Sequence, residues 1–184
     1  SNVYVGTIIV DAEITKPTVT TEDINNNFGF ISETSSLTNS NNDRNHNIRI
    51  ASETIDGTIL QPGEQFSFNG ALGQRTPEKG YMKAPTIQGG KSEPDYGGGI
   101  CQLSTMLYQS VVKADLQVDK RWPHQWPSSY CDPGADAAVD WPSQDFIFTN
   151  NSEYPIAIHA FYDIDHTTVT VQIYGHKLAD GVTI

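Results

Sequence analysis

Basic residues are scarce in this sequence. Eleven Lys and Arg stand against 22 Asp and Glu, which gives a formal net charge of -11 at pH 7. A protein that binds nucleic acid needs a cationic surface to neutralise phosphates, so the composition argues against that class of partner. An acidic surface instead suits a partner that carries amines.

Cysteine is also scarce. Cys101 and Cys131 allow one disulfide at most, which is far from a disulfide framework. Together with scattered histidines they show no paired metal-ligand spacing, so we expect neither a metal nor a cofactor.

Long hydrophobic runs are absent as well. No apolar segment approaches the ~18 residues of a transmembrane helix, and Ser1-Asn2 does not open a signal segment. We expect a soluble, monomeric excerpt or mature form that makes no membrane contact of its own. Residues 1–20 read as the tail or linker of a preceding module, 21–176 as one domain, and 177–184 as a C-terminal tail.

The hydrophobic pattern predicts an α+β fold with two main helices. Ile48, Ala51 and Ile55 mark a helix from Asp43 to Asp56-Gly57, and a second apolar stripe runs from Cys101 to about Ala114. Alternating segments predict strands at 146–150, 156–162 and 168–174. We expect an antiparallel sheet, mostly a meander in the C-terminal third, packed against the helices. The Ser, Thr and Asn residues of 32–45 predict an exposed loop.

The turn Gly97-Gly98-Gly99-Ile100-Cys101-Gln102 carries the strongest chemical signal. Glycines allow a close approach to a ligand, and the first N–H groups of the following helix lack intrahelical partners. The helix dipole favours a thiolate there, and the N–H groups can hold an oxyanion. Cys101 is therefore a candidate nucleophile. A lone cysteine is more often a small buried hydrophobe, and the glycines are what weaken that interpretation.

A cysteine nucleophile needs a base, and His124 is the best candidate because it lies in the irregular segment 121–126. His159 in a strand and His166 in a turn are better explained as packed or solvated side chains, and His46 is undecided. Asp136 or Asp132 could orient the imidazole, and spacing does not choose between them. Trp122, Trp126, Trp141 and Tyr130 suit either a peptide or sugar groove or a plain core.

Several ordered blocks resemble the VanW family. They comprise Leu60 to Asn69, Gly73 to Thr76, Gly80-Tyr81, Ala84-Pro85, Gly97 to Thr105, His124, Tyr130, Gly134 to Ala137, Asp145-Phe146 and Tyr174-Gly175, with Arg44 and Asn47-Ile48 earlier. The resemblance covers about residues 22 to 176. Cys131 departs from the family pattern. A permanent bond between Cys131 and Cys101 would remove the nucleophile.

The resemblance implies a role in the cell wall of Gram-positive bacteria, outside the membrane, in a full-length protein anchored to it. Residues 3–19 are similar to the tail of a peptidoglycan-binding module that often precedes this domain. The family has been linked to L,D-transpeptidation, in which a thiol attacks a tetrapeptide stem before its terminal D-Ala. The acyl group then passes to an amine of a neighbouring stem and forms a 3-3 cross-link.

Carried over to this chain, the resemblance implies that Cys101 is the nucleophile and that Gly99, Ile100 and Gln102 supply backbone donors. We further assign His124 as general base and acid, with Asp136 as its orienting group. Substrate binding is assigned to Arg44, Arg75, Ser104, Trp126 and Tyr130; either arginine could pair with a stem-peptide carboxylate.

Two alternatives stay open at this point. One is a non-catalytic cell-wall module in which the glycine turn holds a stem-peptide carboxylate and Cys101 is structural. The other keeps the thioester but passes it to water, which would make the domain a carboxypeptidase or endopeptidase.

Overall fold

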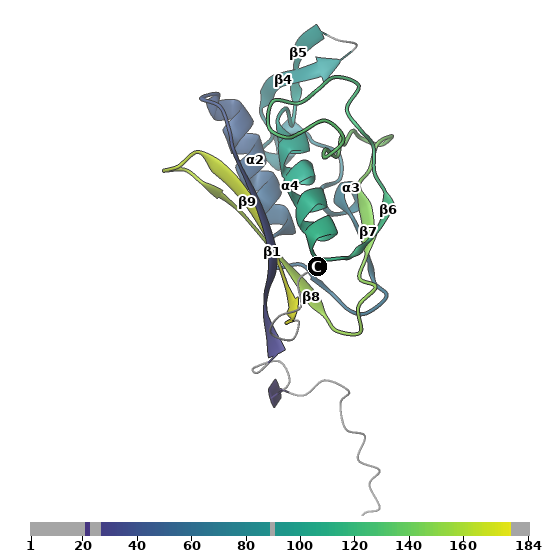
Figure 1. The fold of residues 1–184 in the computed structure, drawn as a ribbon. Helices are drawn as coiled ribbons and strands as arrows, with labels where there is room; N and C mark the ends of the chain where they lie inside the picture. Colours follow the sequence, from purple (N-terminus) through teal and green to yellow (C-terminus); the bar gives the residue numbers. More distant parts are fainter. Residues whose placement is uncertain (1–20, 23–26, 89–90, 178–184) are drawn as a thin grey trace, which may run out of the picture.

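A four-stranded antiparallel sheet forms one side of the fold in the computed structural model, which describes residues 21–22, 27–88 and 91–177 (Figure 1). Its strands in spatial order are β1 (Phe28–Leu37), β9 (Thr168–His176), β8 (Ile156–Asp163) and β2 (Ile59–Leu60). Along β8, Ile156, Ile158 and Ala160 are buried, because alternate side chains of a strand point to the same face. The sheet therefore presents an apolar face to the rest of the fold.

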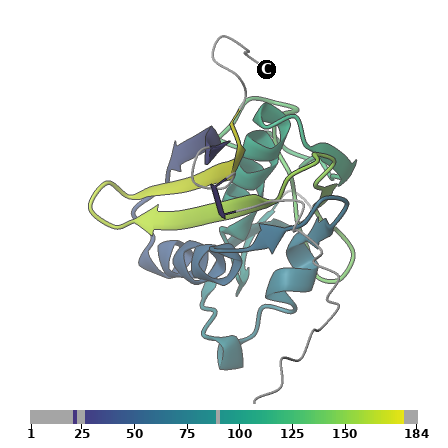
Figure 2. The same cartoon turned by 90° about the horizontal axis from the view of Figure 1, so that it is seen from below.

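Two helices cover this inner face. Helix α2 (Asn42–Ile55) contacts β8, whereas α4 (Ile100–Lys113) contacts β1 and β9, and the two helices contact each other (Figure 2). Helix α2 begins with a cap from Asn41, whose side chain accepts a hydrogen bond from the Arg44 N–H at 2.8 Å. Helix α4 buries Leu103, Leu107 and Val111 completely. The core lies between the sheet and this helix pair.

Shorter elements complete the fold around α2 and α4. A three-stranded sheet has the order β3 (Gln65–Ser67), β7 (Ile147–Thr149), β6 (Gln117–Lys120), and a hairpin joins β4 (Lys83–Gln88) to β5 (Lys91–Tyr96). Helix α3 (Phe68–Leu72) and the 3-10 helix η1 (Pro77–Lys79) lie between these in sequence. The rings of Phe66 and Phe146 each pack against the ring of Phe148, and all three residues belong to the core.

The predicted α+β class and both predicted helices are confirmed. The hairpin of β8 and β9 is confirmed too, but β7 does not continue it into a meander. It pairs with β3 and β6 in the second sheet. A three-residue strand has little pattern of its own, so its sequence does not specify its partners.

The predicted loop at 32–45 is wrong over its first half. Residues up to Leu37 belong to β1, which pairs with β9 along its length. Ser32 and Thr34 are buried toward α4, and the Ser32 hydroxyl donates to the Ser110 carbonyl at 2.7 Å. Small hydroxyl side chains whose hydrogen bonds are satisfied can occupy the inner face of a strand, which the composition of the segment concealed.

The predicted module tail at 1–20 and all but the first residue of the predicted tail at 177–184 lie outside the described residues. None of the helices within the described ranges is long and apolar enough to cross a membrane.

A matched isoleucine pair tests the position of the core. Ile173 on β9 is 0% exposed and Ile164 in the β8–β9 turn is 75% exposed. We expect Ile173→Ala to lower the free energy of unfolding by about 2–5 kcal/mol, because it leaves a cavity. Ile164→Ala should change it little. Urea denaturation of both variants measures this, and equal losses would contradict the described packing of β9.

Candidate active site

Each of the three glycines in the turn before α4 occupies a position where a side chain would be unfavourable. Gly97 and Gly99 have φ of 79° and 104°, in the left-handed region that glycine tolerates best. A Cβ on Gly98 would lie 2.3 Å from the carbonyl oxygen of Ala84. The turn thereby packs its backbone against β4 and delivers Cys101 in the first turn of the helix.

The sulfur of Cys101 makes hydrogen bonds with both backbone groups of Val139. Its thiol donates to the Val139 carbonyl at 3.4 Å, and the Val139 N–H donates to the sulfur at 3.5 Å. The segment that carries Val139 is fastened to α4 one turn further on. The Ser104 hydroxyl donates to the Ala137 carbonyl at 2.5 Å, and the Ala137 N–H donates to the Thr105 hydroxyl at 3.1 Å.

The same segment carries Asp136, which holds His124. One carboxylate oxygen, Oδ2, contacts His124 Nδ1 at 2.6 Å and accepts the His124 backbone N–H at 2.5 Å. The other, Oδ1, accepts from Arg121 Nη2 at 3.0 Å. The Asp136 side chain is only 8% exposed, so these contacts compensate the burial of its charge.

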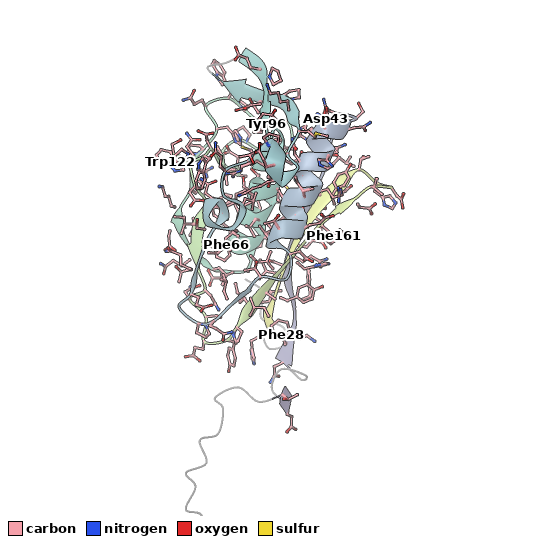
Figure 3. The ribbon with its side chains drawn as sticks, turned by 180° about the vertical axis from the view of Figure 1, so that it is seen from behind. Phe28, Asp43, Phe66, Tyr96, Trp122 and Phe161 are labelled. Carbon is pink, nitrogen blue, oxygen red and sulfur yellow. The ribbon has the colours of Figure 1, made fainter. Side chains whose placement is uncertain are left out.

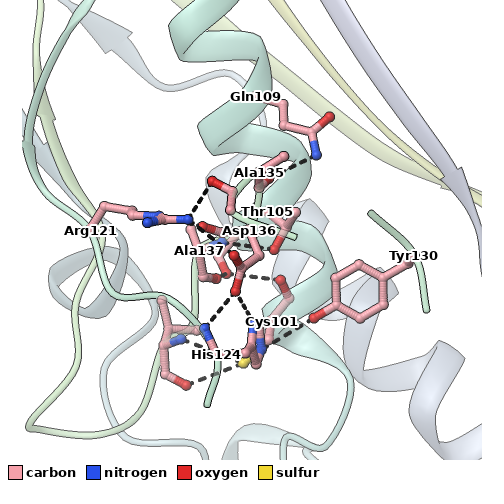
Figure 4. A network of polar contacts seen from close by, with 12 residues as sticks. Cys101, Thr105, Gln109, Arg121, His124, Tyr130, Ala135, Asp136 and Ala137 are labelled. Atoms are coloured by element: carbon pink, nitrogen blue, oxygen red, sulfur yellow. Dashed lines mark hydrogen bonds and ion pairs between the residues drawn. The ribbon is translucent and has the colours of Figure 1, made fainter. Parts of the chain in front are cut away.

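The imidazole of His124 lies beside the sulfur of Cys101 (Figure 4). Because Asp136 occupies Nδ1, the ring presents Nε2 on its other side, where the Tyr130 hydroxyl is 3.3 Å away. Burial by itself would lower the pKa of His124, but its hydrogen bonds and charge interactions with Cys101 and Asp136 raise that pKa above the ordinary value. Burial opposes ionisation of Asp136 too, yet His124 holds the pKa of that carboxyl below the ordinary value. These contacts favour the imidazolium form of His124.

Two of the three predicted backbone donors are already engaged. The Ile100 N–H donates to the Gly97 carbonyl at 3.2 Å and the Gln102 N–H to the Gly99 carbonyl at 3.0 Å, since the turn closes on itself. The N–H groups of Gly99 and Cys101 have no hydrogen-bond partner among the described residues. The N–H groups of Gly99, which was predicted as a donor, and of Cys101, which was not, are therefore both available to a ligand.

Two arginines flank the glycine turn. The side-chain stem of Arg75 lies against Gly97 and that of Arg44 against Gly99, at positions that a Cβ would occupy. Arg44 Nη2 donates to Gln102 Oε1 at 2.7 Å, and Arg75 Nη1 to the Gly73 carbonyl at 3.0 Å. Burial lowers the pKa of both guanidinium groups, against the opposing charge interactions of tyrosines and Cys101. Their Arg44 Nη1, Arg75 Nε and Arg75 Nη2 atoms are buried without a partner in the described structure.

The other predicted residues fall into two groups. Tyr130 contacts His124. Trp126 lies on the loop that carries His124 and is 57% exposed. Trp122 of the same loop also lies at the surface (Figure 3). Ser104 is completely buried and its hydroxyl donates to the Ala137 carbonyl, so the structure shows it as a core residue, and its predicted role in substrate binding stays a prediction. The regular helix places its side chain on the core side, which the motif letters do not reveal.

The alternative histidines make their contacts elsewhere in the structure. His46 contacts the Gly80 carbonyl, His159 contacts Asp56, and His166 contacts Asp163. Both cysteines are free thiols. Burial raises the pKa of Cys131, and the nearby carboxylates of Asp136 and Asp132 raise it further, so this thiol is a poor rival nucleophile.

Sequence reasoning missed the residues that hold the site together. Thr105 and Val139 were given no role, because a hydroxyl or a backbone group that acts across 32 or 38 residues leaves no spacing pattern. Arg121 precedes the Trp-Pro-His segment in the sequence. Its hydrogen bonds to the Gly134 carbonyl and the Asp136 carboxylate show that it helps to hold Asp136 in place. Within the described residues, no three His, Cys, Asp or Glu side chains gather as potential metal ligands.

Fold and site together define a class of protein: an α+β domain in which a cysteine at a glycine-bounded helix start contacts a histidine held by an aspartate. The model of the VanW-like protein family matches residues 43–174, and the chain belongs to that family. No solved structure matches the chain.

Two curated relatives are similar over the same region. YoaR of Bacillus subtilis (strain 168), described as uncharacterized, is 44% identical over 121 residues, which are 66% of this chain and 40% of that protein. The vancomycin B-type resistance protein VanW of Enterococcus faecalis (strain ATCC 700802 / V583) is 26% identical over 136 residues, 71% of this chain and 49% of that protein. The match spans less than half the length of either relative.

Removing the carboxylate that holds His124 tests the electrostatics. The raised pKa of His124 means that its ionised form stabilises the fold below the ordinary value of about 6.5, and that this contribution is lost as pH rises through the raised pKa. We expect Asp136→Asn to lower the pKa of His124 and to cost about 1–3 kcal/mol of stability at mildly acidic pH.

Histidine titration by NMR and urea unfolding between mildly acidic and mildly alkaline pH measure both effects. The control is Asp163→Asn, which removes the exposed partner of His166 and should leave His124 unchanged. A His124 pKa at or below the ordinary value in the wild type would refute the ion-pair description.

Proposed function

We propose that this domain is a cysteine acyltransferase acting on peptidoglycan, of the L,D-transpeptidase type. The observation that carries the proposal is the contact of Cys101, His124 and Asp136 at the start of α4. A nucleophile beside a base, with a third group orienting that base, is the arrangement that covalent acyl transfer requires. Membership of the VanW family supports the cell wall as the setting.

In the proposed reaction, His124 first takes the proton of the Cys101 thiol at Nε2, which leaves a thiolate beside an imidazolium. The sulfur attacks the carbonyl carbon that precedes the terminal D-Ala of a tetrapeptide stem. As the C–N bond breaks, His124 passes its Nε2 proton to the departing D-Ala amine, and a thioester remains on Cys101. Asp136 keeps Nδ1 protonated and the ring in place throughout.

Oxyanion stabilisation in this scheme comes from the start of α4. The unpaired N–H groups of Gly99 and Cys101 and the positive end of the helix dipole suit the negative charge that develops on the attacked carbonyl oxygen. The Val139 N–H, which contacts the sulfur, stabilises the thiolate before attack.

We place the protein outside the cytoplasmic membrane, in the cell wall or at the membrane's outer face. The two relatives come from Bacillus subtilis and Enterococcus faecalis, and one is named for vancomycin resistance. The partners proposed are peptidoglycan stem peptides, bound by a monomer without a cofactor.

Intact-protein mass spectrometry with a disaccharide tetrapeptide tests the nucleophile. Wild type should gain the mass of the donor minus D-Ala, and Cys101→Ala should gain nothing, because the thioester cannot form. Cys131→Ala is the matched control and should form the adduct like wild type, since that thiol is protonated and lies outside the triad. An adduct on Cys101→Ala would eliminate Cys101 as the nucleophile. Binding of the donor without any adduct on wild type would favour the non-catalytic stem-peptide module.

The unpartnered guanidinium atoms support a role for Arg44 and Arg75 in holding the carboxylate of the leaving D-Ala. Arg75 is 8% exposed, and two of its buried nitrogens lack a partner. A charge-assisted hydrogen bond contributes about 1.5–3 kcal/mol, which is roughly 10- to 100-fold in rate.

We therefore expect a donor whose C-terminal carboxylate is amidated to acylate wild type that much more slowly than the free acid. Arg75→Gln should lose this preference for the acid, and Arg44→Gln provides the parallel measurement. Stopped-time mass spectrometry gives the acylation rates. An equal preference in wild type and in both variants would show that neither arginine reads the carboxylate.

A further inference from the structure

Asn47 on α2 is a completely buried polar side chain that has no part in the scheme above. It is 0% exposed, and its amide makes three hydrogen bonds to backbone groups. The oxygen accepts from the Met82 N–H at 2.8 Å. The nitrogen donates to the Met82 carbonyl at 2.9 Å and to the Gly98 carbonyl at 3.0 Å. Both N–H groups of the side chain are thus used on carbonyl oxygens.

These hydrogen bonds attach α2 to the glycine turn. The turn follows β5 and leads into α4, and α2 contacts both α4 and β4 (Figure 1). Met82 lies immediately before β4, and its carbonyl also accepts from the Gly97 N–H at 3.2 Å. A side chain of a regular helix therefore holds the turn from outside the segment that forms it.

The peptide between Gly98 and Gly99 needs such a contact. Glycine adopts either sign of φ readily, and Gly99 has φ of 104°, so the local backbone does little to select one orientation of this peptide. A trans peptide is planar, and its C=O and N–H point in opposite directions. The hydrogen bond that holds the Gly98 carbonyl therefore also sets the direction of the Gly99 N–H.

The Gly99 N–H is one of the two donors at the start of α4 that have no partner among the described residues. The other is the N–H of Cys101, which belongs to the regular helix and is oriented by it. Gly99 is the N-cap and lies outside the helical backbone, with no side-chain cap. The helix thus orients one donor, and Asn47 orients the other.

We propose that Asn47 is a positioning residue for oxyanion stabilisation, which holds the Gly98–Gly99 peptide so that the Gly99 N–H meets the carbonyl oxygen that Cys101 attacks. This inference rests on the proposed function. Asn47 touches no substrate atom and transfers no proton. Loss of an oxyanion donor costs about 10²–10³ in rate, so a donor that is present but no longer held should cost less, about 10- to 100-fold.

Two reactions of the same sulfur separate this role from a merely structural one. With p-nitrophenyl acetate, the sulfur attacks the ester carbonyl, an oxyanion forms, and the C–O bond to p-nitrophenolate breaks to leave an acetyl thioester. With iodoacetamide, the sulfur displaces iodide from a saturated carbon and no oxyanion forms. Both reactions need the thiolate, and only the first needs the Gly99 donor.

Asn150 supplies a matched control. It is also 0% exposed, and it lies between β7 and β8 in the sequence. Its amide nitrogen donates to the carbonyls of Leu60 and Tyr154 at 3.0 and 2.8 Å, and its oxygen accepts from the Ser152 N–H at 3.1 Å. Asn47→Ser and Asn150→Ser therefore remove equivalent buried hydrogen bonds, and we expect similar losses of stability in urea unfolding.

The experiment is carried out in the Cys131→Ala background, so that Cys101 is the only thiol. Release of p-nitrophenolate and the mass of the acetyl adduct give the acylation rate, and the mass of the carbamidomethyl adduct gives the alkylation rate. Asn47→Ser should be acetylated about 10- to 100-fold more slowly than the parent and alkylated at the parent rate. Asn150→Ser should match the parent in both reactions.

A second substitution keeps the test informative if Asn47→Ser does not fold. Asn47→Asp has nearly the same shape, keeps the acceptor for the Met82 N–H, and offers at most one donor to the two carbonyls. It should show the same selective loss of acylation.

The outcomes distinguish the positioning role from the proposed function. Equal slowing of both reactions in the Asn47 variants, no slowing of either, or the same loss of acylation in Asn150→Ser would overturn the positioning role. Selective slowing of acetylation, together with no adduct from the disaccharide tetrapeptide on wild type, would support that role and overturn peptidoglycan as the substrate.

Discussion

The attachment of segment 136–139 to the first turns of α4 is the constraint on which the site depends. Ser104 and Thr105 hold Ala137, and Val139 in turn brackets the Cys101 sulfur. Asp136 lies immediately before this anchored stretch, so its carboxylate has a fixed position relative to the thiol. The loop bearing His124 then binds to that carboxylate through both its backbone and its ring. An irregular segment acquires a defined geometry because a buried helix supports it.

The charged side chains around Cys101 are largely buried, and they differ in how far their charges are compensated. Asp136 is nearly inaccessible and is compensated by His124 and Arg121, while Arg44 and Arg75 are compensated only in part. A buried donor without a partner is unfavourable, and such atoms in folded proteins call for an explanation such as a ligand. The partly compensated arginines stand at the start of α4, where the helix itself already attracts an anion. The same end of the helix thus supplies the nucleophile and the groups that suit its substrate.

Sequence reasoning recovered the elements with a strong period and missed those without one. The apolar stripes of α2 and α4 and the alternation in β8 and β9 were sufficient to predict them. The sequence predicts a loop over the part of β1 from residue 32, because Ser32 and Thr34 bury hydroxyls whose partners are on another element. The sequence pattern also predicts the wrong sheet for β7. Its partners β3 and β6 lie far from it in sequence, and nothing in three residues specifies them.

The sequence by itself determined the α+β class, the helix that starts at the glycine turn, and the candidates Cys101, His124 and Asp136. Those follow from local propensities and from motif blocks that lie within short stretches of chain. Only the tertiary structure decided that Asp136 rather than Asp132 holds His124, that Ser104 is a core residue, and that Ile100 and Gln102 close the turn. It also decided that the Tyr130 hydroxyl lies 3.3 Å from His124 Nε2. Such relations join side chains across separate elements, and periodicity along one segment carries no information about them.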